Sequence, residues 1–175
     1  MPDDVPLLEL SSLSVRRGRV NVLNSINLKV SSGDVVLLVG ENGSGKSTLI
    51  EAAAGILPLS TGEVKHSDQL VRDSEGRRSK PQPFGLALQS GGFSQDELVE
   101  ERIATAVAVS GYEAESDWIS ARLDEWALRH RAKDRIAWLS EGMNRRVGVL
   151  AGIVPALASS EGKLILLDEP SEGLD

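Results

Sequence analysis

Cysteine is absent from the 175 residues, so neither a disulfide bond nor a thiolate metal site can form. Basic residues are also outnumbered: 19 Lys and Arg stand against 26 Asp and Glu, which gives a formal net charge of -7. Nucleic-acid backbones are bound through clustered Lys and Arg side chains, so we expect no nucleic-acid partner.

Long apolar runs are missing as well. The longest nearly apolar stretch, 147–158, contains Pro155 and falls short of the ~20 residues that a membrane-spanning helix needs. The N-terminus, MPDDVPLLEL, is acidic where a secretory signal would be basic. We therefore expect a cytoplasmic chain of one domain, and any membrane part of its function would come from another subunit.

Four segments have the pattern of β-strands. Apolar and polar residues alternate over 26–30, and more weakly over 8–15, which is typical of strands with one buried face. Residues 35–39 and 164–167 are unbroken apolar runs, as in strands buried on both faces of a parallel sheet. The sequence therefore predicts an α/β domain.

The remaining elements are expected from propensity and turn signals. A helix is predicted over 46–54, with Gly55 as its stop, and another from Ser140. The segment 67–83 is polar and predicts a loop, 84–88 a short strand, and 96–135 a helical region in which Ile119, Leu123 and Trp126 share one face with core character.

A phosphate-binding loop is indicated by GENGSGKS at 40–47, which matches the pattern G-x-x-x-x-G-K-S in full. Glycines let backbone N–H groups point at an anion, and the N-terminus of the following helix adds partial positive charge. Lys46 would reach the β- and γ-phosphates, and the Ser47 hydroxyl suits Mg²⁺. The nucleotide-binding residues expected here are Gly40, Asn42, Gly43, Ser44, Gly45, Lys46, Ser47 and Thr48.

Two acids follow the last predicted strand. Asp168 and Glu169 would lie at its carboxyl end, where ligands bind in open α/β sheets. Asp168 would hold Mg²⁺ directly or through a water, and Glu169 would polarise the water that attacks the γ-phosphate. Two acids that merely mark a surface turn are the alternative.

The order of motifs resembles the ATP-binding cassette (ABC) family over nearly the whole chain. GENGSGKS is followed by Gln89 after a strand, LSEGM at 139–143, LILLDEP at 164–170 and SEGLD at 171–175. The resemblance implies a P-loop NTPase core with a parallel sheet, an N-terminal antiparallel β subdomain and an inserted helical subdomain at approximately 90–160. It also implies that ATP and Mg²⁺ are the ligands.

Further roles are implied by the resemblance alone. Gln89 would be a switch glutamine that touches Mg²⁺ or the attacking water. Ser140 and Gly142 would contact the γ-phosphate of ATP bound to a second subunit, and Asp175 would lie at the dimer interface. Arg17 stands where the family usually has an aromatic residue, and it would stack on adenine.

Two departures from the family pattern stand out. The signature LSEGM, with Glu141 and Met143 in place of the commonest glycine and glutamine, resembles exporter-type subunits. The family's switch histidine would follow Asp175, and His66 and His130 match nothing. We therefore expect a cassette that lacks the C-terminal strands and the switch histidine.

The expected function is ATP hydrolysis as the motor subunit of an exporter-like ABC transporter. The chain would pair with a second ABC subunit and lie at the inner face of the cell membrane through a separate transmembrane permease. Two alternatives stay open: a truncated cassette that binds nucleotide with little hydrolysis, and a non-transport ABC ATPase.

Overall fold

The computed structural model describes residues 5–89, 92, 94–160 and 163–171. The chain divides into two compact units, residues 1–82 with 162–164 and residues 83–161 with 165–175. Each unit is built around its own buried apolar side chains. The expected subdomain boundaries, with a helical insert at approximately 90–160, remain a prediction.

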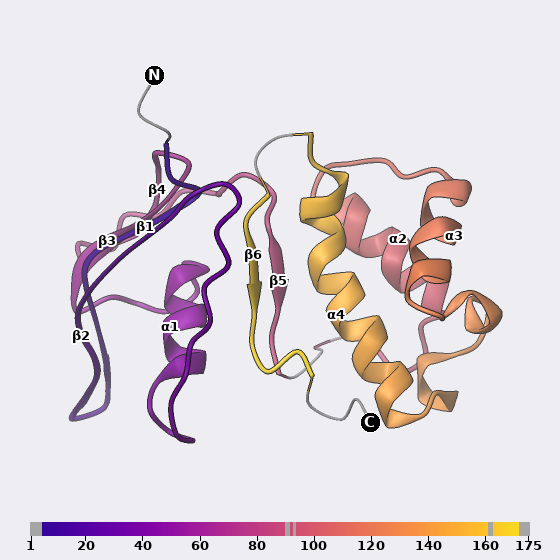
Figure 1. Cartoon of the computed structure of the whole chain (residues 1–175), viewed down its shortest axis with the longest axis horizontal. Coiled ribbons are helices and arrows are strands. Elements are labelled where there is room, and N and C mark those ends of the chain that lie inside the picture. The colour runs from indigo at the N-terminus through magenta and orange to yellow at the C-terminus, as the bar shows by residue number, and fades with distance from the viewer. Residues whose placement is uncertain (1–4, 90–91, 93, 161–162, 172–175) are drawn as a thin grey trace. The chain divides into compact units, whose positions relative to one another are not determined.

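The first unit contains a four-stranded antiparallel sheet (Figure 1). Its strand order is β2-β1-β3-β4, from β1 (Leu8–Arg17), β2 (Val20–Val30), β3 (Thr61–His66) and β4 (Gln69–Asp73). Alternate residues of β1 are buried, among them Leu8, Leu10, Leu13 and Val15, as the period-2 pattern predicts.

Helix α1 (Lys46–Ala53) packs against β1 and β2 of this sheet. Gly55, with φ of +72°, follows its end, so the predicted helix and its stop are confirmed. The His66 side chain of β3 is buried, and its Nε2 donates a 2.8 Å hydrogen bond to the Ala53 carbonyl. Burial lowers the pKa of His66 below its ordinary value, and the hydrogen bond to Ala53 only partly opposes that effect.

The second unit is mainly helical. It contains α2 (Val99–Val109), α3 (Ser116–Glu125), α4 (Glu141–Ala158) and the short 3-10 helices η1 (Arg129–Arg131) and η2 (Ile136–Trp138). Leu123 is fully buried, and Ile119 and Trp126 pack against the same core, so the predicted apolar face of 96–135 is confirmed as core.

Two short strands complete the second unit, with β5 (Gly85–Ala87) parallel to β6 (Ile165–Leu167) (Figure 1). Helix α4 approaches β5 closely at Gly152, where an added Cβ would lie 2.5 Å from the Leu86 carbonyl oxygen. Only glycine fits at this crossing, and the close approach brings the N-terminal half of α4 near the ends of both strands.

Two strand predictions need correction. Residues 35–39 form no strand and have no ladder partner in the described part of the chain, and Val35, Leu37 and Val39 are 96%, 83% and 86% exposed. In β6, Ile165 and Leu167 are each 37% exposed, so that strand is not fully buried. An apolar run records a preference for burial, but burial on two faces requires neighbouring elements that the run itself does not specify.

The predicted loop over 67–83 is also wrong in part, because it contains β4. Val71 of β4 is buried, and the strand pairs with β3 across a turn at Ser67 and Asp68, both of which have positive φ. A single buried apolar position in a polar segment gives too short an alternation to identify a strand.

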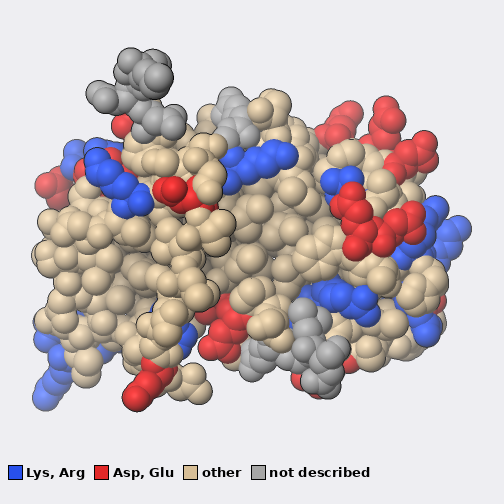
Figure 2. All heavy atoms as spheres, viewed as in Figure 1, with Lys and Arg blue, Asp and Glu red and all other residues tan. Residues whose placement is uncertain are grey.

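The surface carries charges of both signs. On the face drawn in Figure 2, acidic and basic side chains of the described residues are interspersed, with no continuous basic stripe among them. Among the helices that the structure describes, none is long and apolar enough to cross a bilayer.

A test of the His66 contact follows from its lowered pKa. The His66 imidazole binds a proton less tightly in the folded state than in the unfolded chain. Its contribution to the free energy of unfolding is therefore fully present above the unfolded pKa of 6.5 and falls as the pH drops below that value. Urea unfolding between about pH 7.5 and 5 should therefore show a decline in the free energy of unfolding that is smaller in His66→Gln. His130→Gln, at an exposed site, is the control and should keep the parental slope. Equal slopes in the parent and His66→Gln would contradict this account.

Candidate functional site

The glycine-rich loop leads directly into α1. Gly45 is the N-cap of that helix with φ of +99°, and Gly43 has φ of +82°, both in the region that L side chains disfavour. An added Cβ at Gly45 would lie 3.2 Å from Val22 Cγ1 and 3.3 Å from Leu23 Cδ2 of β2. Two separate constraints, backbone conformation and contact with the sheet, therefore require glycine at position 45.

Lys46 is folded over the loop that precedes it. Its Nζ donates hydrogen bonds to the carbonyls of Gly40, at 2.9 Å, and Glu41, at 3.0 Å. The first turn of α1, which includes Ser47 and Thr48, contains no acidic residue, so the partial positive charge of the helix N-terminus is not offset by a carboxylate of that turn. This arrangement is suited to a bound anion.

Arg17 lies at the end of β1 and is engaged by α1. Its Nη2 donates to Glu51 Oε2 at 2.6 Å, while the guanidinium side chain stays 55% exposed. Stacking on a base would use the open face of the guanidinium plane. The role of Arg17 in binding adenine stays a prediction.

In the second unit, three predicted residues come together at the ends of β5 and β6. Asp168 is 4% exposed, and its N–H donates to the Ala87 carbonyl at 2.9 Å, which extends the parallel ladder by one residue. Gln89 Nε2 donates to Glu169 Oε2 at 3.4 Å. A buried carboxylate thus lies beside a half-exposed one whose side chain meets an amide.

An arginine that the sequence analysis missed lies at the same strand ends. Arg145, in the second turn of α4, donates to the carbonyls of Leu88, Gln89, Asp168 and Glu169. Sequence offered no signal for it, because one of two adjacent arginines on a helix has the pattern of an ordinary surface charge.

Ser140 is the N-cap of α4 and is exposed. Its Oγ accepts a hydrogen bond from the Met143 N–H at 3.3 Å, so it caps its own helix, which begins where the sequence predicts. Gly142 lies in the first turn beside Glu141, the acid of that turn. Asp175 lies outside the described residues.

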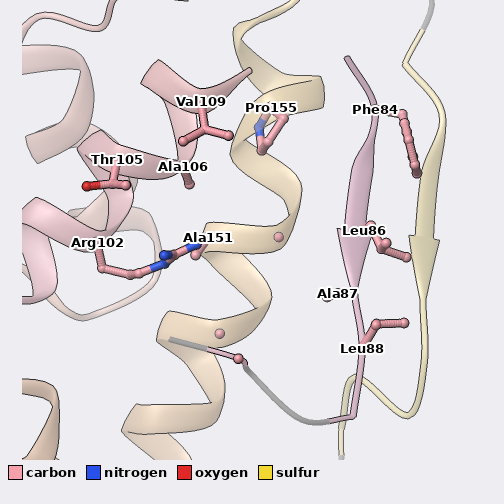
Figure 3. A pocket seen from close by; sticks show the side chains of 13 residues that line it. Phe84, Leu86, Ala87, Leu88, Arg102, Thr105, Ala106, Val109, Ala151 and Pro155 are labelled. Carbon is pink, nitrogen blue, oxygen red and sulfur yellow. The ribbon is translucent and has the colours of Figure 1, made fainter. Parts of the chain in front are cut away.

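A cavity of about 570 Å³ also lies in the second unit, between α2, α4 and β5 (Figure 3). Its lining is mainly apolar, with Arg102 and Thr105 as its polar side chains from α2. Among the described residues that line it, none carries a carboxylate.

The chemistry of the predicted metal ligands fits Mg²⁺. Ser47, Gln89 and Asp168 offer hydroxyl, amide and carboxylate oxygens, which are hard donors, and Mg²⁺ usually combines one or two carboxylates with substrate phosphates and water. Among the described residues, no group of three His, Cys, Asp or Glu side chains could hold a metal ion.

Comparisons with known proteins identify the family. The family model described as "ABC transporter" matches residues 23–172. The lipoprotein-releasing system ATP-binding protein LolD of Anaplasma marginale is 33% identical over 174 residues, covering 97% of this chain and 75% of that protein. The hemin import ATP-binding protein HmuV of Myxococcus xanthus is 35% identical over 179 residues, covering 96% of this chain and 65% of that protein.

A solved structure supports the fold. It is that of a metal-chelate type ABC transporter in an inward-facing conformation, with a TM-score of 0.71 and 24% identity, covering 98% of this chain and 62% of that one. The predicted fold class, with an antiparallel β subdomain and a parallel sheet, is thereby confirmed. The chain belongs to the ABC transporter family and is an ATP-binding domain of that ATPase family.

Proposed function

We propose that this chain hydrolyses ATP as a motor subunit that acts on a separate transmembrane permease, with Glu169 as the general base. The observation that carries the proposal is the grouping of Gln89, Asp168 and Glu169 at the ends of two parallel strands. A buried carboxylate beside a half-exposed one matches the division between a metal ligand and a base.

The loop residues hold the triphosphate in this proposal. Backbone N–H groups of 43–48 and the N-terminus of α1 bind the phosphate oxygens, and Lys46 exchanges its two carbonyl partners for the β- and γ-phosphates. Ser47 and Asp168, with Gln89, would hold Mg²⁺, which when bound neutralises phosphate charge.

Glu169 and Gln89 handle the attacking water. A carboxylate oxygen of Glu169 accepts a proton from the water while the water oxygen bonds to the γ-phosphorus. The bond between the γ-phosphorus and the bridging oxygen breaks, and ADP leaves. The Gln89 amide, already in contact with Glu169, orients the same water or a ligand of the cation.

A second cassette completes the site in this proposal. Ser140 is exposed at the N-terminus of an 18-residue helix, and its own helix uses only one lone pair of its hydroxyl. Ser140 and Gly142 would therefore contact the γ-phosphate of ATP bound to the partner. Asp175, the last residue of SEGLD, would lie at the same dimer interface.

Location and direction of transport are also part of the proposal. The chain would lie in the cytoplasm, at the inner face of the cell membrane through its permease. Exporter-type coupling rests on Glu141 and Met143 in the signature; relatives named for zinc import, hemin import and cytochrome c biogenesis export all match this chain.

A second candidate is nucleotide binding with little hydrolysis by the chain alone. The exposure of Val35, Leu37 and Val39 favours it, because the segment leading into the phosphate loop has no strand neighbour among the described residues. A loop on an unsupported segment is positioned less precisely, and turnover depends on positioning more than binding does.

Lys46→Ala tests the nucleotide site. Loss of the ammonium should weaken ATP binding by roughly 10- to 150-fold, since a hydrogen-bonded charge contributes ~1.5–3 kcal/mol. Titration with a fluorescent ATP analogue measures the affinity, and Lys80→Ala, at an exposed position of the same unit, is the control. Parental affinity in Lys46→Ala would refute the assigned loop.

Glu169→Gln tests the base. The amide keeps the size of the side chain but cannot take a proton, so kcat should fall by roughly 10²–10⁴-fold while ATP affinity stays near the parental value. Steady-state release of phosphate gives kcat, with Glu113→Gln, an exposed carboxylate, as the matched control. Turnover by Glu169→Gln at the parental rate would rule out this residue as the base. If the unmodified chain binds ATP but hydrolyses hardly any of it, that result would support the second candidate.

A further inference from the structure

One guanidinium holds the backbone at the ends of both strands of the parallel pair. Arg145 Nη1 donates to the Leu88 carbonyl at 3.0 Å and the Gln89 carbonyl at 2.9 Å. Arg145 Nη2 donates to the Asp168 carbonyl at 2.9 Å and the Glu169 carbonyl at 2.6 Å. Two chain segments that are about 80 residues apart in sequence are thus bonded to a single side chain.

The geometry of these bonds is specific to arginine. A guanidinium presents five N–H donors in a fixed plane, so its two terminal nitrogens can serve two separate peptide segments at once. The ammonium of lysine is a single point with three donors, and it cannot span both pairs of carbonyls in the same way.

The backbone at Glu169 depends on such support. Its φ is +47°, in the left-handed region, which costs free energy for any residue with a Cβ. Conformations of this kind persist where the surroundings determine them, and they concentrate at functional sites. The shortest of the four Arg145 bonds is the one to the Glu169 carbonyl.

The backbone at the two strand ends determines where the side chains of Gln89 and Glu169 lie. With both strand ends fixed, Glu169 Oε2 lies 3.4 Å from Gln89 Nε2. Arg145 is also five residues beyond the N-cap Ser140, so its hydrogen bonds link the second turn of α4 to the two strand ends within the second unit.

We propose that Arg145 is a positioning residue, which sets the Glu169 carboxylate for proton transfer by fixing the backbone at the ends of β5 and β6. The proposal rests on the proposed function, in which Glu169 is the base. Arg145 itself touches neither nucleotide nor water in this role, because its two terminal nitrogens donate to peptide carbonyls.

Arg145→Lys and Arg145→Gln test the proposal against the neighbouring residue. Both should lower kcat by about 10–100-fold, since a displacement of about 1 Å at a reacting group costs up to ~10²-fold. The KM for ATP should stay within about twofold of the parent, because the phosphate loop lies in the other unit. Arg146→Lys is the matched control: Arg146 donates to the Trp126 carbonyl, away from the strand ends, and its kcat should stay parental.

A double-mutant cycle separates positioning from general destabilisation. If Arg145 acts through Glu169, adding Arg145→Lys to Glu169→Gln should cause no further loss of kcat. Multiplicative losses, a parental kcat in both Arg145 variants, or an equal loss in Arg146→Lys would overturn the proposal. Failure of the proposed function looks different, because Glu169→Gln alone would then turn over ATP at the parental rate.

Discussion

The arrangement of the second unit depends on how closely α4 approaches β5. Gly152 allows the helix backbone to come within contact of the Leu86 carbonyl, and any side chain there would push the two apart. Because α4 lies so close, Arg145 reaches four carbonyls at the ends of both parallel strands. The positions of Gln89 and Glu169 therefore depend on Gly152, which has no side chain, and on the guanidinium of Arg145.

In the first unit, the feature that must be held in place is the glycine-rich loop. This loop must expose backbone N–H groups, so it cannot rely on side chains to hold its shape. The loop is instead fixed at Gly45, which combines a left-handed backbone with contact to Val22 and Leu23 of β2. The link from α1 to β3, through Ala53 and His66, ties the helix that would bind phosphate to the antiparallel sheet.

Sequence patterns predicted those features that depend on local chemistry. The helix after the phosphate loop, the start of a helix at Ser140 and the strand before Gln89 follow from residue types at short spacing. The fold class was implied by the order of motifs, which resembles the ABC family. The prediction that 35–39 is a buried strand was wrong, because burial depends on neighbouring elements. The strand β4 was missed because Val71 is its sole strongly buried apolar residue. Arg145 could not be found either, because its role arises only when two distant strand ends meet beside one helix.

The central claim is that the chain hydrolyses ATP at a site completed by a second cassette. Its most direct test is the rate of ATP hydrolysis per chain, measured over a wide range of chain concentrations, with light scattering to follow the molar mass. The account predicts that the rate per chain rises with concentration and levels off as dimers form with ATP. A constant rate per chain from protein that remains monomeric with ATP bound would contradict it.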